Sequence, residues 1–449
     1  MFFDRSALLG GRVVHWRSKK GPPGSDQESL FVRQNSGTID KRMNHPPLRR
    51  RRFLQTLTAA GVASELPSFP ALGATPVHAS SVKEEAVFPS EPVSPRYSIR
   101  FAVCGISHGH IYGMVEAIKR GGGILVKAWG QEPELLTAFR KRYPDVPIAG
   151  TQDEIIHDSS LQLVLSSQIA NERAPLGIRC MQAGKDFLSD KPGVTTLEQL
   201  SEVRKTIGAT GRIFAIMYSE RLEVKAAVKA GELVQAGAIG DVIQTINIAP
   251  HQIVQRPGGD AGSVGGKGGR PDWFWNEAQF GGILCDIGSH QVDQFLYYTR
   301  STQAEVVASQ VANLRHPDFP HFQDFGDMML RGNNGFGYVR LDWFTPYGLG
   351  TWGDGRLFIL GTEGYIEARK YANVAVSKQG NHLFVVDQKQ ARYIDCNNLT
   401  LPFGPQFVSD IVNRTHTAQD QTQCLLAAEL VIKAQAMAKR AHLDWESKA

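Results

Sequence analysis

Between residues 98 and 218, short apolar runs alternate with amphipathic segments, and this alternation constrains the fold more than any other feature of the chain. Strands that alternate with helices at this pace favour a parallel, doubly wound α/β sheet. We therefore expect a domain of this class over residues 97–217. The expected strands cover residues 98–105, 123–130, 161–167, 185–189 and 212–218, and the expected helices cover 111–119, 133–142, 175–183 and 196–207.

The first strand-to-helix turn of this pattern runs from Gly105 to His110. Such a turn directs free N–H groups and the positive end of the helix dipole at a phosphate, as in the first unit of a Rossmann domain. Compared with the G-x-G-x-x-G/A pattern, Ser107 stands at the second glycine and His110 at the third. Taken alone, this turn does not distinguish a dinucleotide site from any other strand-to-helix turn of an α/β protein. The residues assigned to this site are Gly105, Ile106, Ser107, His108, Gly109 and His110.

The second expected strand ends where NAD-binding units carry an acidic residue that accepts hydrogen bonds from a ribose. Here that position is Gly130 or Gln131, and Glu132 follows slightly late. A basic run at 140–142 could attract the extra phosphate of NADP, although such runs on helices are more often solvated. The sequence thus leaves NAD and NADP open. We assign Gln131 and, at the end of the third strand, Ser166 to the cofactor.

Asp190, Lys191 and Pro192 follow the expected strand at 185–189. Open α/β sheets bind ligands at the carboxyl ends of their strands. Because proline fixes its own φ angle, the lysine before it is held on a stiffened turn rather than on a mobile loop. We therefore place these three residues at the cofactor site.

A helix expected over residues 283–298 would carry Asp286, His290, Asp293 and Tyr297 on one face. The rest of its surface is mainly apolar, so this polar stripe must find partners, and a cleft with a hydroxylated ligand would supply them. The alternative is that Asp286 charges the first helical turn and that His290 is a hydrogen-bonded core histidine.

Two motifs in this order resemble the Gfo/Idh/MocA oxidoreductase family, and the resemblance extends over residues 98–440. Segment 183–192, AGKDFLSDKP, is similar to the family pattern AGKHVLxEKP, and segment 280–290 is similar to GGGxxxDxxxH with one glycine lost. The resemblance implies a Rossmann domain that binds NAD or NADP. It further implies, over residues 218–441, an α/β domain with a large open mixed or antiparallel sheet, which would bind substrate and contact other subunits of a homo-oligomer.

The resemblance also implies a reaction, namely NAD(P)-dependent oxidation or reduction at a secondary alcohol of a sugar, a cyclitol or a derivative. His290 would accept the proton, Asp286 would orient His290, and Lys191 would donate a hydrogen bond to the reacting oxygen and hold the cofactor. Two alternatives stay open: an NAD-dependent glycoside hydrolase without net redox change, and a non-catalytic sugar- or nucleotide-binding protein. The residues assigned to the substrate are Arg173, Arg221, Trp275 and Asp293.

Composition excludes several other classes. The net charge of +5 is modest and falls largely in the first 52 residues, so it indicates no nucleic-acid surface. The five cysteines are scattered without metal-binding spacing, which indicates neither a disulfide framework nor a zinc site, and we expect no metal. No run approaches the roughly 18 apolar residues of a membrane span.

The N-terminal segment reads as an export signal. Residues 1–42 are polar and without period, which indicates disorder or a start site placed too early, because Met43 is a plausible first residue. Residues 43–79 resemble a twin-arginine signal: Arg50 and Arg51 precede Phe53 and Leu54, a weakly apolar run follows, and VHA at 77–79 is a candidate cleavage site. Residues 80–96 would be a linker. We expect a periplasmic or secreted protein, or a cytoplasmic one if the segment is not a signal.

Overall fold

The computed structural model describes residues 83–85, 95–253, 270–375 and 377–443. The expected signal segment at 43–79 and almost all of a glycine-rich run at 256–270 lie outside these residues. Within them, we find no helix of the length and apolar character that a membrane crossing requires.

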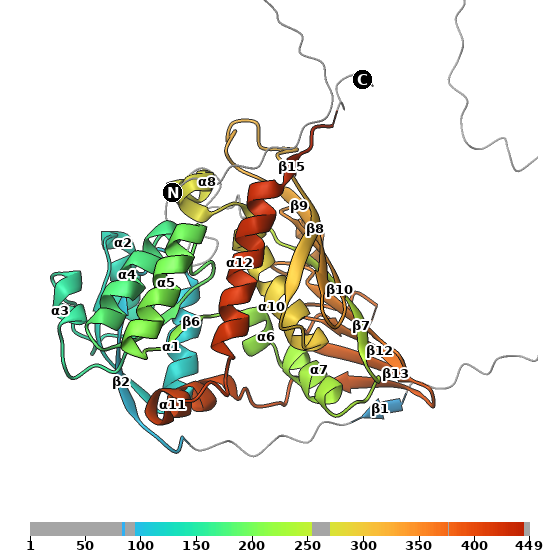
Figure 1. Ribbon diagram of the computed structural model, residues 1–449, viewed down its shortest axis with the longest axis horizontal. Coiled ribbons are helices and arrows are strands. Elements are labelled where there is room, and N and C mark those ends of the chain that lie inside the picture. The colour runs from blue at the N-terminus through green and yellow to red at the C-terminus, as the bar shows by residue number, and fades with distance from the viewer. Residues whose placement is uncertain (1–82, 86–94, 254–269, 376, 444–449) are drawn as a thin grey trace, which may run out of the picture. The chain divides into compact units, whose positions relative to one another are not determined.

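The first sheet has five strands, all paired in parallel, in the order β3-β2-β4-β5-β6 (Figure 1). This arrangement confirms the doubly wound sheet predicted from the alternation. Its strands are β2 (Ile99–Cys104), β3 (Gly123–Trp129), β4 (Leu163–Ser166), β5 (Asp186–Ser189) and β6 (Phe214–Ile216), and its helices are α1 (His110–Arg120), α2 (Pro133–Arg142), α3 (Gln152–Ile156), α4 (Ala170–Gln182) and α5 (Leu197–Thr210).

Side-chain pattern explains why these segments fold as they do. Every residue of β4, β5 and β6 is buried, as expected for central strands covered on both faces. Helix α1 buries Ile111, Met114, Val115 and Ile118, which recur at the helical period and face the sheet.

The second sheet has ten strands in the order β1-β14-β13-β12-β11-β7-β10-β9-β8-β15. β7 and β10 are parallel at its centre and most other pairs are antiparallel, so the predicted mixed sheet is confirmed. Its strands are β1 (Lys83–Glu85), β7 (Val242–Pro250), β8 (Ala304–Ala312), β9 (Phe325–Gly332), β10 (Phe336–Asp342), β11 (Arg356–Gly361), β12 (Gly364–Arg369), β13 (His382–Asp387), β14 (Ala391–Asp395) and β15 (Lys439–Arg440).

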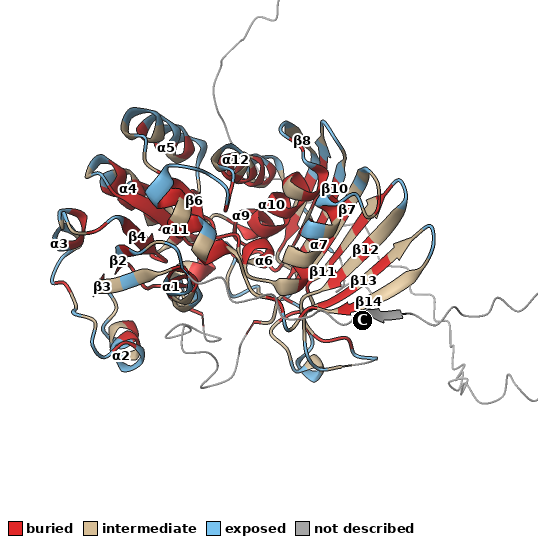
Figure 2. Ribbon diagram, turned by 90° about the horizontal axis from the view of Figure 1, so that it is seen from below, coloured by how far each residue is buried: buried red, intermediate tan, exposed pale blue. Residues whose placement is uncertain are grey.

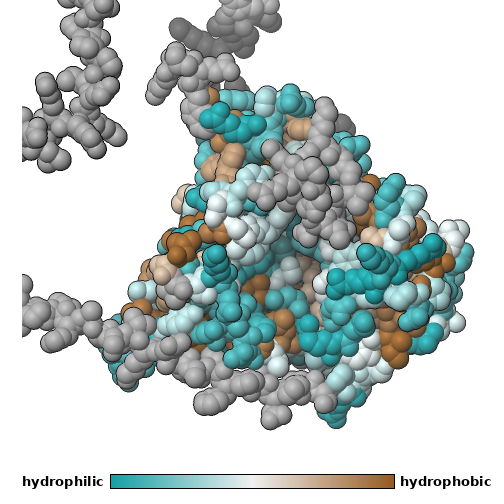
Figure 3. All heavy atoms as spheres, turned by 180° about the vertical axis from the view of Figure 1, so that it is seen from behind, coloured by the Kyte–Doolittle hydropathy of each residue, from teal (hydrophilic) through white to brown (hydrophobic). Residues whose placement is uncertain are grey.

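Helices cover one face of this sheet (Figure 2). They are α7 (Lys225–Gln235), α10 (Gly288–Thr299) and α12 (Gln421–Met437), which contact β12, β10 and β8 respectively. On the other face Val307, Met329 and Phe336 are exposed. Figure 3 shows apolar residues in small groups among a mainly hydrophilic surface.

The C-terminal part of the chain also packs on the first sheet. Helix α11 (Phe403–Asn413) lies against α1, where Gly404 comes so close that an added Cβ would overlap the carbonyl group of Ala117. Helix α12 contacts α5 on one side and α10 on the other (Figure 1). The range 218–441, predicted as a separate domain, thus contributes a helix to the packing of the first sheet, and β1 lies within the predicted linker.

The helix predicted at 283–298 is present with an interruption at Ile287, which separates α9 (Ile283–Asp286) from α10. Gly281 and Gly282 precede it with φ angles of 88° and 86°, which favour glycine. The remaining helical segments are α6 (Ser219–Leu222), α8 (Glu277–Phe280), η1 (Asp272–Trp275) and η2 (Tyr347–Leu349).

Candidate active site

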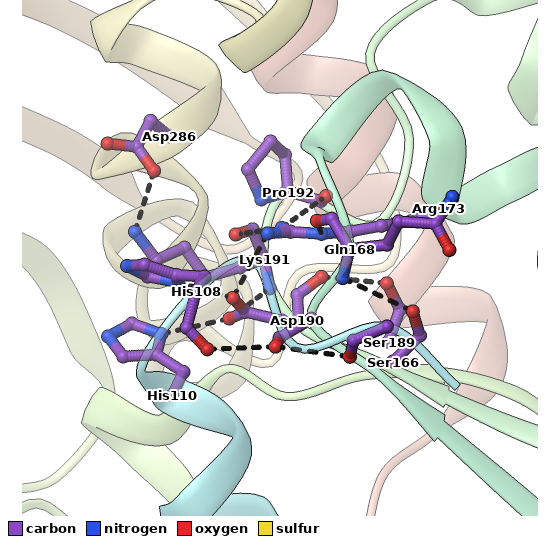
Figure 4. Close-up of polar contacts among 12 residues, drawn as sticks. His108, His110, Ser166, Gln168, Arg173, Ser189, Asp190, Lys191, Pro192 and Asp286 are labelled. Atoms are coloured by element: carbon purple, nitrogen blue, oxygen red, sulfur yellow. Dashed lines mark hydrogen bonds and ion pairs between the residues drawn. The ribbon is translucent and has the colours of Figure 1, made fainter. Parts of the chain in front are cut away.

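Three neighbouring strands of the first sheet end at one place, where β2 leads into the turn at 105–109, β4 into residues 167–168 and β5 into residues 190–192 (Figure 4). Because β2, β4 and β5 are adjacent and parallel, their carboxyl ends form one edge. This edge is where open α/β sheets bind ligands.

Gly105 shapes the turn. Its φ is 98°, and an added Cβ would lie 2.7 Å from the Cβ of Gln168 and 3.1 Å from the Oγ of Ser166. Its N–H donates to the carbonyl of Trp129 and its carbonyl accepts from the N–H of Ser167. Only glycine fits here. Ser166, assigned to the cofactor from sequence, is fully buried beneath this glycine and instead supports the turn.

The backbone of the turn is free to bind an anion. Among the described residues, no backbone carbonyl accepts from the N–H groups of 106–109, and no side chain caps helix α1. Unpaired N–H groups at a helix N-terminus suit a phosphate. The turn therefore fits the diphosphate of a dinucleotide, although two of the three expected glycines are replaced.

At the end of β3, the acidic residue Glu132 comes one position after Gln131, the later of the two expected places. Gln131 is exposed, whereas Glu132 is half-buried and its Oε2 has no hydrogen-bond partner among the described residues. A carboxylate oxygen buried here without a partner can accept from a ribose hydroxyl. The structure thus favours Glu132 over Gln131 for this contact.

Asp190 is fully buried and joins the turn to β5. Its carboxylate lies 2.6 Å and 2.9 Å from the Nδ1 atoms of His108 and His110, and it accepts from the N–H of Lys191. Burial alone would raise the pKa of Asp190, but Arg173, then the two histidines, outweigh it and hold the pKa well below its usual range. Asp190 is therefore an anion that positions its neighbours.

Arg173, assigned to the substrate from sequence, has a different position. It is 1% exposed, and its guanidinium donates to the carbonyls of Gln168, Lys191 and Pro192 and pairs with Asp190. With its donors committed to the protein, it fixes the turn after β5 rather than contacting a ligand.

Lys191 reaches from the first sheet to α9, where its Nζ lies 2.7 Å from Oδ1 of Asp286. The peptide bond between Lys191 and Pro192 is cis. Burial would raise the pKa of Asp286, but Lys191 outweighs it and holds this pKa below its usual value. Asp286 is thus an anion paired with Lys191, and no hydrogen bond to His290 is present in the described part of the chain.

His290 is 2% exposed, and its Nδ1 has no hydrogen-bond partner among the described residues. Its ring lies 6.5 Å from that of His110 and 6.4 Å from that of Tyr218, measured between centroids. Burial lowers the pKa of His290 well below its usual value, and Glu220 opposes this only in part. His290 is therefore a neutral imidazole, which can accept a proton.

A second polar cluster, which the sequence did not reveal, adjoins His290. Glu220 of α6 accepts from Gln291 at 2.6 Å and from Lys370 at 3.0 Å, and His251 lies 3.9 Å from it. Burial would raise the pKa of Glu220, but Lys370, then His290 and His251, lower it. Lys370 follows β12, far along the chain, so no local motif marks it. Glu220 directly precedes Arg221, which was assigned to the substrate, so this neighbour in the sequence was the available signal for Glu220.

The other residues assigned to the substrate pack within the protein. Arg221 pairs with Asp293 through two hydrogen bonds, of 2.6 Å and 3.0 Å, and both residues are buried. Trp275 is 8% exposed and stacks on Phe319 with ring centroids 3.9 Å apart. These contacts place Arg221 and Asp293 in a buried ion pair and Trp275 in an aromatic core rather than along a sugar.

Comparisons with known proteins agree with this fold. Residues 227–367 match the GFO/IDH/MocA C-terminal domain. A crystal structure of a protein assigned as an oxidoreductase, from Erwinia carotovora atroseptica SCRI1043, is 44% identical, covers 77% of this chain and all of its own, and has a TM-score of 0.72. KijD10, a 3-ketoreductase from Actinomadura kijaniata solved with NADP and TDP-benzene, is 15% identical over 77% of this chain and all of its own, with a TM-score of 0.59, and shows the fold alone.

Two characterised relatives match over shorter segments. The scyllo-inositol 2-dehydrogenase (NADP(+)) IolW of Bacillus subtilis (strain 168) is 24% identical over 42% of this chain and 50% of its own length. The D-xylose dehydrogenase of Paenarthrobacter nicotinovorans is 24% identical over 31% of this chain and 34% of its own. The chain thus spans half or less of the length of each of these two relatives. From the extended match at 44% identity, the matched C-terminal domain and the shared fold, we conclude that the chain belongs to the Gfo/Idh/MocA family of oxidoreductases.

Proposed function

We propose that the protein uses NAD or NADP to oxidise or reduce a secondary alcohol of a sugar, a cyclitol or a derivative. The observation that carries the proposal is the neutral, buried His290, whose Nδ1 has no partner among the described residues, close to a turn that fits a diphosphate. The inositol and xylose dehydrogenases among the relatives support this substrate class.

The residues of the chain have separate tasks in this reaction. His290 accepts the hydroxyl proton of the alcohol, and as it becomes an imidazolium it gains the favourable charge of Glu220. Lys191, held by Asp286, donates a hydrogen bond to the same oxygen. The nicotinamide, when bound, supplies the hydride acceptor or donor. The turn at 105–109 holds the diphosphate, with Glu132 on the ribose.

This division of tasks changes the role predicted for Asp286. The sequence assigned it to orient His290, but its carboxylate is paired with Lys191 at 2.7 Å. Glu220 is the acidic residue whose charge acts most strongly on His290. We therefore propose that Glu220 stabilises the protonated base and that Asp286 positions the lysine.

The test is a screen of sugars and inositols with NAD or NADP, followed by kinetics of His290→Ala on the best substrate. Turnover should fall by about 10²- to 10⁴-fold, the usual range for a positioned proton-transfer group, while cofactor affinity is retained. His416→Ala, at an exposed position, is the control and should match the parent. Near-parental turnover in His290→Ala would reduce His290 to a core histidine and remove the proposed base.

We also propose a homo-oligomer. The open face of the ten-stranded sheet exposes Val307, Met329 and Phe336, and a second copy of the chain would cover them. Light scattering on the purified protein measures this directly, and a monomer at micromolar concentration contradicts it.

A further inference from the structure

His108 and His110 place two imidazoles beside each other on the turn before α1. Their ring centroids are 4.1 Å apart with an interplanar angle of 51°, and Figure 4 shows both rings on the same side of Asp190. A single glycine separates them in sequence. Such proximity of two histidines with a carboxylate is a frequent geometry of metal ligands.

Asp190 determines which ring nitrogen of each histidine is free. Its carboxylate also accepts from the N–H of Lys191 and pairs with Arg173, so it stays an anion and can only accept. The Nδ1 atoms of His108 and His110, at 2.6 Å and 2.9 Å, must therefore carry the hydrogens. The lone pairs are left on the two Nε2 atoms. A carboxylate that fixes the histidine tautomer in this way is the usual outer partner of metal-bound histidines.

The two Nε2 atoms are available to a ligand. No described residue forms a hydrogen bond with either of them, and the side chain of His110 is 42% exposed while that of His108 is 14% exposed. One ring nitrogen of His108, one ring nitrogen of His110 and one carboxylate oxygen of Asp190 lie within 4.8 Å of one another. Among the described residues, this is the group of three side chains of metal-binding type whose ligand atoms come so close.

We propose that His108 and His110 bind a divalent transition-metal ion through Nε2, with Asp190 as the carboxylate that orients both rings. Two imidazoles leave further coordination positions for oxygen atoms, as in open rather than closed metal sites. The charges of Asp190 and Asp286 are balanced by Arg173 and Lys191, so the bound ion adds net positive charge beside the free N–H groups of the turn. This charge complements a diphosphate, and it offers a physical reason for histidines where the glycine pattern is broken.

The test uses the full chain without a histidine tag, treated with chelator, incubated with Zn²⁺ alone and gel-filtered before elemental analysis. About one zinc per chain is expected. His108→Gln and His110→Gln should each lose most of it, because one imidazole remains. Co²⁺ as a second probe should give a visible absorption spectrum that the variants lack. No dinucleotide or substrate is added, so the outcome is independent of the proposed reaction.

The matched control is His316→Gln. His316 also places its Nδ1 near a buried carboxylate, 2.8 Å from Asp324, but among the described residues no second histidine joins it in such a group. This variant should retain zinc at the parental level, and circular dichroism should show all variants folded. Two results would overturn the proposal: a parent chain that retains no more zinc than a variant in which both His108 and His110 are changed to glutamine, or single variants that retain as much as the parent.

Discussion

Two consecutive residues, Asp190 and Lys191, connect different parts of the site. Asp190 turns toward the histidines of the first turn, and Lys191 turns toward Asp286 on α9. The two side chains thus leave one short segment after β5 in different directions. The sequence predicted that these residues lie at a strand end. It could not show their partners, because Asp286 is 95 positions away in the chain.

Substitutions of Glu220 and of Lys370 should shift the pKa of His290 in opposite directions. Glu220→Gln removes the carboxylate that raises the pKa of His290, so this pKa should fall further and the acid limb of kcat/KM should move to lower pH. Lys370→Gln removes a positive charge that lowers the same pKa, so the acid limb should move to higher pH.

Each of these two variants removes one partner of the Glu220–Lys370 pair, in which Glu220 is buried and the Lys370 side chain is 27% exposed, so the free energy of unfolding should drop by about 1–3 kcal/mol. Urea denaturation measures this loss, and pH profiles measure the shifts. Shifts in the same direction for both variants would show that general destabilisation, rather than charge, acts on the base.

Glu132 should set the cofactor preference. A carboxylate that binds the ribose hydroxyls repels the extra phosphate of NADP, so the parent should bind NAD more tightly. Glu132→Ser should narrow the ratio of the two dissociation constants by about tenfold, which corresponds to about 1.4 kcal/mol. Fluorescence titration measures both affinities. Gln131→Ser is the control and should leave the ratio of dissociation constants unchanged. An equal change of this ratio in the two variants would show that Glu132 does not make the ribose contact.

At the scale of single elements, the sequence predicted most strands and helices of the first sheet within a few residues. The main differences lie at the start of α4 and within the helix predicted over 283–298. Helix α4 begins at Ala170, although Pro175 suggested a later start, because Pro175 is accommodated within the helix. Helix 283–298 is interrupted at Ile287, where the N–H of His290 bonds to the carbonyl of Ile287 three positions before it. The periodicity indicated a shared face but not this tighter turn.

The turn after β2 should tolerate no side chain at Gly105. Gly105→Ala would combine a positive φ with a Cβ 2.7 Å from Gln168, so stability should drop by about 1–3 kcal/mol and cofactor affinity should fall with it. Gly113→Ala on α1 is the matched control, because its Cβ would meet no atom within 4 Å. That change should stabilise the helix by up to about 1 kcal/mol. Urea denaturation distinguishes the two, and similar values for both would refute the steric argument.

At the scale of the whole molecule, the sequence predicted both sheets but not how the chain connects them. Local patterns show which face of a helix is apolar without showing what covers it. Helix α11 covers α1, and α12 contacts both α5 and α10. These helices are far apart in the sequence, and no sequence motif indicates that they pack together. The prediction of no metal rested on cysteine spacing alone, and the two histidines were assigned only to the cofactor turn.

We expect export in folded form, from the twin-arginine pattern at residues 50–54. Changing both Arg50 and Arg51 to lysine should remove the protein from the periplasmic fraction, because this pathway reads the arginine pair. Arg49→Lys is the control and should leave export intact. Cell fractionation followed by immunodetection measures the outcome. Undiminished periplasmic protein in the double variant would contradict the signal assignment.

The contact between α11 and α1 has a consequence for the order of synthesis. Phe403, Phe407 and Val408 belong to the same buried cluster as the apolar face of α1. A ribosome makes α1 hundreds of residues before α11, so this face has no native cover until residues 403–413 have been made. The nucleotide-binding half therefore cannot finish folding while its own segment emerges. It must stay partly assembled until residues 403–413 have been made.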